Sequence, residues 1–237
     1  MAMISASHHH CAIFDADAAP HEGMTMDELR GRAPAIGAGR GEAIFLLALV
    51  GGVLLWSAVA PNDRMTWLME VVWVLAAIPL LVATRRRFPL TRLLYWLLAI
   101  HAVILVYGGQ YTYAETPLGD WARDAFGLAR NHYDRLGHFA QGFVPAILAR
   151  ELLLRLTPLR RGGWLFYLVC AACLSFSAFF EFIEWWAALV MGGDADAYLA
   201  TQGDVWDTQW DMFLALCGSV IAQLLLARVH DRQLGLH

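Results

Sequence analysis

The sequence contains no lysine, and only 16% of its 237 residues are charged. Soluble domains carry about 25% charged residues, so this share is low for a protein surrounded by water. All 17 basic residues are arginines, and they form no block large enough to indicate a nucleic-acid partner. The four cysteines do not indicate a disulfide framework. Two of them, Cys170 and Cys173, lie inside an apolar run, where we expect them to act as small packing residues.

Hydrophobic residues make up 59% of the chain and are concentrated in six segments. About 20 apolar residues in a helix are enough to cross the hydrocarbon core of a bilayer. A buried helix of a soluble protein rarely stays apolar over that length. The segments extend over residues 43–60, 66–84, 93–109, 132–156, 164–191 and 208–229. The sequence therefore predicts an all-α, polytopic membrane protein in which residues 41–231 form a bundle of six transmembrane helices.

The arginines indicate the orientation of this bundle, because cytoplasmic loops of membrane proteins carry an excess of positive charge. A chain that crosses six times with both termini in the cytoplasm places thirteen of the seventeen arginines on the cytoplasmic side. They include the RRRFPLTR loop at residues 85–92. The opposite side carries the acidic residues Glu115, Asp120, Asp124, Asp194, Asp196 and Asp204. We therefore expect a multi-pass protein of the bacterial inner membrane, with the lipid bilayer as its surroundings.

Residues 1–40 differ from the rest of the chain in composition. They mix Ala, Gly, Asp and His without any apolar periodicity. Such a segment cannot bury enough apolar surface to offset the entropy lost on folding. We expect a disordered cytoplasmic tail.

Ionisable residues inside predicted spans are functional candidates, because each costs about 2.5–3.5 kcal/mol to insert. Here they recur at helical spacing in three consecutive segments, so that each set shares one face of its helix. The sets are Asp134, His138 and Gln141 in the fourth segment, Ser177, Glu181 and Glu184 in the fifth, and Asp204, Asp207 and Asp211 in the sixth. From the rise of an α-helix, His138 and Glu184 lie about 9 and 10 Å from the outer ends of their helices.

If these three helices are neighbours, they enclose one acidic pocket that opens to the periplasmic face. Crowded carboxylates need a cation to offset their repulsion. Carboxylate oxygens with one imidazole suit magnesium, manganese or zinc. We expect the metal ligands to be His138, Glu181, Asp207 and Asp211. The other lining residues would be Tyr133, Gln141, Ser177 and Asp204.

This pocket predicts a membrane-embedded, metal-dependent enzyme that acts on a lipid or envelope precursor, with Asp134 or Glu184 as general base. Three alternatives stay open. Buried carboxylates also serve proton- or cation-coupled transporters. The protein could be a non-catalytic membrane partner with a structural cation. In a purely structural interpretation, Asp204 or Asp207 caps the sixth helix and Asp134 pairs with an arginine.

Several of these segments resemble a known family. The motifs are YDRLGHFAQGF at 133–143, ARE at 149–151, EFIEWW at 181–186 and GDVWDTQWDM at 203–212, followed by Gly218. Together they resemble the YjdF-type inner-membrane family, a bacterial domain of unknown function, over about residues 43–230. The resemblance implies a fold and a location but no reaction. The D-x-x-x-H-F at 134–139 and the D-x-x-x-D at 207–211 also look like a looser VanZ-like pattern, and VanZ-like proteins are linked to glycopeptide resistance and the cell envelope.

Overall fold

The computed structural model describes residues 37–192 and 199–236, and it contains helices and no strand within these residues. The all-α prediction is therefore confirmed. The long helices are α2 (Arg40–Val59), α3 (Arg64–Thr84), α4 (Arg92–Tyr111), α6 (Tyr133–Leu156), α7 (Gly163–Met191) and α9 (Asp207–Gln233). Residues 1–36 of the predicted tail lie outside the described residues, and Arg40 already begins α2.

Five of the described helices are long and apolar enough to cross a membrane, namely α2, α3, α4, α7 and α9. The helix α6 is not among them, because it carries five charged residues: Asp134, Arg135, Arg150, Glu151 and Arg155. It contacts α4, α7 and α9, and 13 of its 24 residues are buried. Many of its polar groups therefore meet protein instead of lipid, which is compatible with crossing. The sixth span stays a prediction.

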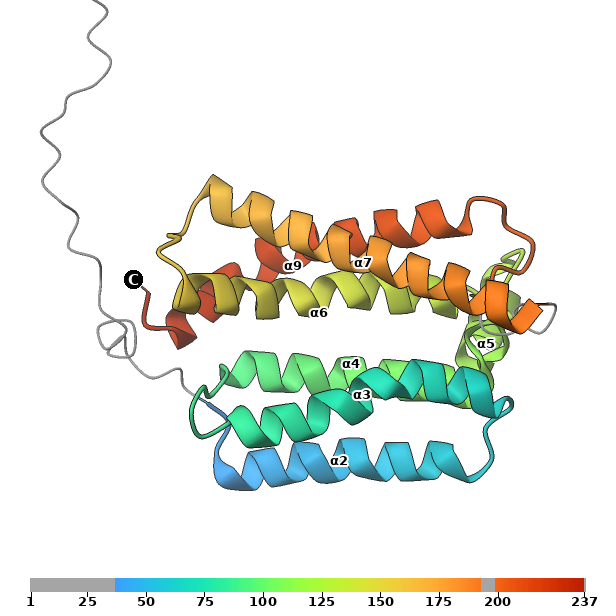
Figure 1. The fold of residues 1–237 in the computed structure, drawn as a ribbon, viewed down its shortest axis with the longest axis horizontal. Coiled ribbons are helices and arrows are strands. Elements are labelled where there is room, and N and C mark those ends of the chain that lie inside the picture. Colours follow the sequence, from blue (N-terminus) through green and yellow to red (C-terminus); the bar gives the residue numbers. More distant parts are fainter. Residues whose placement is uncertain (1–36, 193–198, 237) are drawn as a thin grey trace, which may run out of the picture. The chain divides into compact units, whose positions relative to one another are not determined.

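The long helices form two layers (Figure 1). One layer contains α2, α3 and α4, and the other contains α6, α7 and α9. The layers are joined where α4 packs against α6. Two apolar clusters fill this arrangement, one among α2, α3 and α4 around Val71 and Val106, and one among α4, α6, α7 and α9 around Leu94 and Ile147. Cys173 belongs to the second cluster, as predicted for a packing residue.

The most extensive helix contact joins α6 to α9, and two glycines make it close. A Cβ atom at Gly142 would overlap the backbone of Ala215, and one at Gly218 would overlap the backbone of Phe139. Small residues allow such approaches between membrane helices. The close approach brings the polar faces of α6 and α9 together.

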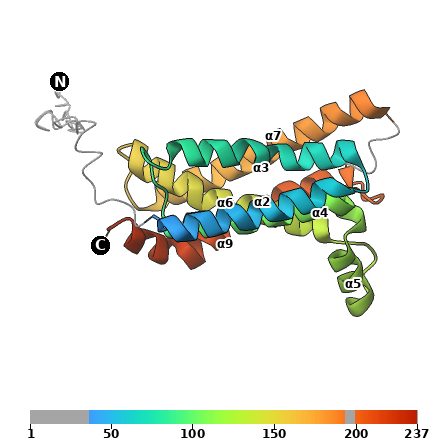
Figure 2. The same cartoon turned by 90° about the horizontal axis from the view of Figure 1, so that it is seen from below.

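The two ends of the bundle differ in their connections. At one end, α4 is followed by the short helices η1 (Tyr113–Glu115) and α5 (Pro117–Phe126), and α5 projects away from the long helices (Figure 2). The opposite end carries the arginine-rich loop between α3 and α4, the loop between α6 and α7, and the C-terminal end of α9. We refer to the two ends as the acidic end and the arginine end.

A buried polar cluster holds the arginine end together. Glu151 of α6 accepts hydrogen bonds from the Thr91 hydroxyl at 2.8 Å, from Arg155 at 2.6 Å and from His230 Nε2 at 3.1 Å. Arg150 donates to His230 Nδ1 at 2.8 Å. Since arginine can only donate, the proton of neutral His230 lies on Nε2 and is given to Glu151. This chain of paired groups joins the start of α4 to α6 and α9.

Candidate metal centre at the acidic end

His138 is the centre of the polar face of α6. Its Nδ1 lies 3.0 Å from Oε1 of Gln141, one turn further along the same helix. An amide oxygen can only accept, so this contact places the imidazole proton on Nδ1. Gln141 therefore engages Nδ1, and Nε2 is the nitrogen that a metal ion or a second proton would occupy. Histidines that bind metals are held in the same way, with the second ring nitrogen donating to an oxygen of the protein.

The Nε2 atom of His138 faces two carboxylates. It lies 3.6 Å from Oδ1 of Asp134 and 3.9 Å from Oδ2 of Asp211. Both distances are too long for hydrogen bonds. The two carboxylates are stabilised by a positive charge at Nε2, which a bound metal ion or a second proton on the imidazole would supply. In the described residues no arginine pairs with Asp134, so the structure does not support the predicted alternative of an arginine pair.

The spacing of these three groups fits a small divalent ion. One ligand atom from each of Asp134, His138 and Asp211 lies within 4.8 Å of the others. An ion with bonds of about 2.0–2.2 Å separates its ligands by about 3.0–3.5 Å. The two distances from His138, 3.6 and 3.9 Å, would shorten by about 0.1–0.9 Å on binding such an ion. Asp134 was predicted to be the general base, with Glu184 as the alternative, whereas this geometry groups Asp134 with the candidate ligands.

Burial leaves several oxygens of the site without partners. Asp134, His138 and Asp211 are 6%, 5% and 2% exposed. Among the described residues, no hydrogen-bond partner is present for Asp134 Oδ2, Asp211 Oδ1, Glu181 Oε1 or Ser177 Oγ. Buried polar atoms are nearly always satisfied, because an unpaired one costs about 1–3 kcal/mol. A cation or ordered water at this place would satisfy these oxygens.

The α7 residues lie beside this group. Glu181 Oε1 is 3.9 Å from His138 Nδ1, so it faces the ring nitrogen that Gln141 already occupies. Ser177 is fully buried one turn away. Glu184 lines a cavity of about 70 Å³ that also reaches Asp134 and His138. Glu181 and Glu184 therefore lie beside His138, and Glu181 is not one of the three candidate ligands.

Asp204 and Asp207 are held by arginines. Arg130 donates to Asp207 at 2.9 Å and Arg135 donates to Asp204 at 2.7 Å. Asp204 also accepts the backbone N–H of Trp206, the residue before α9, at 3.0 Å. Neither acid caps α9, whose N-cap is Trp206, but both have the arginine pairs that a structural role requires. The geometry does not support Asp207 as a metal ligand, because its charge is already neutralised.

Two residues of the site were not anticipated. Glu70 of α3 is 5% exposed and lines the same cavity, where it meets the Tyr113 hydroxyl. Burial raises the pKa of Tyr113 well above its ordinary value, so the hydroxyl keeps its proton and donates to Glu70. The Tyr113 ring fits between Gly108 and Gly137, where a Cβ would lie 2.5 Å and 2.8 Å from ring atoms. Glu70 is the single acid in the segment 66–84, and the cost of a buried charge could have identified it.

Tyr133, which was predicted to line the pocket, makes other contacts in the structure. The cavity of about 70 Å³ does not include it. Its hydroxyl donates to the carbonyl of Ile104 at 2.9 Å, and its ring packs against Tyr107 and Tyr113. Tyr133 therefore packs against the Tyr113 ring and helps to hold it in place.

The comparisons with known proteins agree with the membrane architecture. Residues 42–232 match a family described as "Predicted membrane protein (DUF2238)". The chain is 53% identical over 182 residues to "Inner membrane protein YjdF" of Escherichia coli (strain K12). The aligned region makes up 77% of this chain and 87% of the relative. No solved structure matches. These matches confirm the resemblance to the YjdF-type family and do not extend to the VanZ-like pattern. The protein is a multi-pass inner-membrane protein, and it belongs to the DUF2238 family of predicted membrane proteins.

Proposed function

We propose that Asp134, His138 and Asp211 bind one divalent metal ion, and that the protein is a membrane-embedded hydrolase of a lipid or envelope precursor. The observation that carries the proposal is the buried group of three side chains, in which Nε2 of His138 faces two carboxylates at 3.6 and 3.9 Å. Oxygen ligands with one imidazole suit zinc, magnesium or manganese. A bound zinc ion would lower the pKa of its water to about 7, which makes hydroxide available at neutral pH, whereas magnesium or manganese would act mainly by polarising the substrate.

The adjoining cavity supports hydrolysis. Its volume of about 70 Å³ exceeds the roughly 10–15 Å³ that one water needs, so water fits beside the proposed ligands. Glu184 and Glu70 line it, and either carboxylate is positioned to take a proton from that water. Because the site lies among membrane-spanning helices, amphiphilic molecules of the membrane are the substrates within its reach.

Packing next to the site favours an enzyme over a transporter. Gly142 and Ala215 lie one turn beyond His138 and Asp211 toward the arginine end, and there the backbones of α6 and α9 touch. A contact this close leaves no space for water between the two helices at this level. The acidic cluster is therefore closed on that side of the α6–α9 interface. The space between α2, α3 and α4 that adjoins it is lined mainly by apolar side chains, which is unfavourable for the passage of an ion.

The same proposal includes an orientation. Positive-inside arginines at residues 85–92 and 155–161 lie at the same end of the bundle as the end of α9 (Figure 1). We expect both termini in the cytoplasm and the acidic cluster near the periplasm. A reporter fused after Arg161 should give a cytoplasmic signal, and a periplasmic signal would overturn this orientation.

Metal content tests the site. The full chain is purified in mild detergent, exposed in turn to zinc, manganese and magnesium, desalted, and its metal is counted by mass spectrometry. We expect about one equivalent in the wild type and in Asp124→Asn, an exposed control in α5. His138→Gln and Asp211→Asn should lose it. Asp207→Asn should keep it, because Asp207 belongs to the arginine pair.

The outcomes separate binding from catalysis. A wild type without metal, or an Asp211→Asn protein that keeps a full equivalent, would refute the metal site. If metal binds, lipid phosphates and envelope precursors are tested for metal-dependent cleavage that Asp211→Asn abolishes. A protein that keeps its metal and cleaves none of them would instead support a structural cation.

A further inference from the structure

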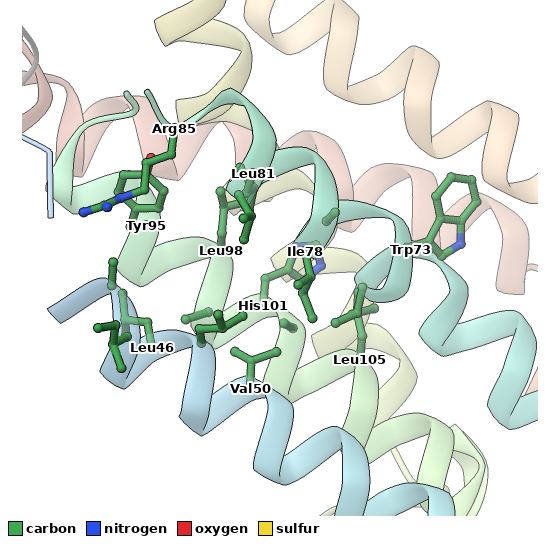
Figure 3. A pocket seen from close by; sticks show the side chains of 18 of the residues that line it. Leu46, Val50, Trp73, Ile78, Leu81, Arg85, Tyr95, Leu98, His101 and Leu105 are labelled. Carbon is green, nitrogen blue, oxygen red and sulfur yellow. The ribbon is translucent and has the colours of Figure 1, made fainter. Parts of the chain in front are cut away.

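A long apolar groove lies between α2, α3 and α4. It has a volume of about 540 Å³, and its walls include Leu46, Val50, Ile78, Leu98 and Leu105 (Figure 3). The helices α2 and α3 each pack extensively against α4 but hardly against one another. The groove is therefore the space that α2 and α3 leave between them above α4. No side chain of the described residues fills it.

The groove carries positive charge at one end. Arg40, Arg85 and Arg86 line it at the arginine end of the bundle. None of these three makes an ion pair within the part of the chain that the structure describes, and Arg85 donates to the carbonyl of Ala38 at 2.8 Å. The neighbouring Arg92 differs, because Glu42 binds it at 2.7 Å. Three guanidinium groups beside an apolar groove fit a ligand that is both anionic and apolar.

The length of the groove matches one leaflet of a membrane. It extends from Arg85 to Trp73, twelve residues along α3, which corresponds to about 18 Å. Half of a hydrocarbon core is about 15 Å thick. An acyl chain whose headgroup lies at the arginine end would therefore reach to about the level of Trp73. Basic pockets between membrane helices on the cytoplasmic side are typical sites for anionic headgroups.

We propose that this groove binds one anionic glycerophospholipid, with its phosphate on Arg85 and Arg86 and one acyl chain along α3 and α4 as far as Trp73. Guanidinium groups bind phosphate with two parallel hydrogen bonds. The far end of the groove meets the acidic cavity, because Trp73, His101 and Leu105 line both. The lipid would thus form part of the wall between the groove and the site. The lipid site does not depend on metal binding.

Native mass spectrometry tests the headgroup. The full chain is stripped of lipid in detergent and given equal amounts of phosphatidylglycerol and phosphatidylcholine with identical acyl chains. We expect one phosphatidylglycerol to be retained in preference to phosphatidylcholine. Arg85→Gln/Arg86→Gln should lower this preference about tenfold or more. Arg87→Gln is the matched control, since Arg87 is exposed in the same loop and does not line the groove.

A second pair of variants tests the acyl chain. Ala77 lines the groove, whereas its neighbour Ala76 is exposed outside it. Ala77→Phe should lose lipid of either headgroup, and Ala76→Phe should retain it. Size-exclusion profiles show whether each variant is folded. If Ala77→Phe does not fold, the lipid preference of the double arginine variant alone tests the proposal. Equal retention of the two lipids by the wild type, no retained lipid, or unchanged phosphatidylglycerol binding by the double arginine variant would overturn the proposal.

Discussion

Replacing Gly218 by alanine tests the contact that brings α6 and α9 together. A Cβ at this position would overlap Phe139 O and lie 2.8 Å from Phe143 N, both in the backbone of α6. Backbone atoms cannot rotate aside, so the two helices must separate. Overpacking costs about 1–3 kcal/mol, and we expect the upper value here. Alanine regains about 1 kcal/mol in helix propensity, so the free energy of unfolding should fall by about 2 kcal/mol.

The matched control is Gly52→Ala in α2, where an added Cβ meets no atom within 4 Å among the described residues. This variant gains propensity without a clash, and it should be as stable as the wild type or more stable by up to about 1 kcal/mol. Both variants are compared by equilibrium unfolding in mixed micelles. Equal stability of the two would refute the close backbone contact. If the metal site exists, Gly218→Ala should also bind less metal, because separation moves Asp211 away from His138.

Two further predictions concern buried polar groups, and thermal unfolding measures both. Tyr113→Phe leaves the buried Glu70 carboxylate without its donor and should destabilise the protein by about 1–3 kcal/mol; an unchanged stability would show that this hydrogen bond contributes nothing. Arg130→Gln leaves the buried Asp207 unpaired and should cost about 3–5 kcal/mol. Its control is Arg123→Gln, which breaks partly exposed pairs on α5 and should cost less than about 1 kcal/mol. Similar losses in the two arginine variants would contradict the assignment of the first pair to the core.

Apolar runs and breakers predicted the long helices to within a few residues. The segment 132–156 became α6 (Tyr133–Leu156), and the segment 208–229 became α9 (Asp207–Gln233), which continues one turn further. The helix α5 was missed, because it is short and carries charge. Its boundaries have local signals nonetheless, since Pro117 occupies the first helical position and Gly127 ends the helix in the left-handed conformation. A search for apolar runs cannot detect such a helix.

The sequence predicted those contacts of the candidate site that lie within a single helix. The spacing of Asp134, His138 and Gln141 places them on one face of α6, and the structure brings His138 and Gln141 into contact. The choice among acids was not predictable in this way. Whether Asp207 or Asp134 joins His138 depends on Arg130, which lies in the connection before α6 and reaches across to α9. Helical spacing carries no information on a partner from another segment.

The polarity of α6 follows from its position in the bundle. A helix that faces lipid must be apolar, and α6 is the long helix that fails this criterion. Its charged residues fall into two groups near opposite ends, with Asp134 in the acidic cluster and Glu151 in the cluster at the arginine end. Both groups contact side chains of α9. Asp211 lies near His138 in the acidic cluster, and His230 donates to Glu151 at the arginine end. The arginine-end group is fully paired by protein atoms, whereas the acidic group keeps unpaired oxygens. A cluster needed only to hold two helices together would be satisfied at both ends, so the unpaired end is where a ligand is expected.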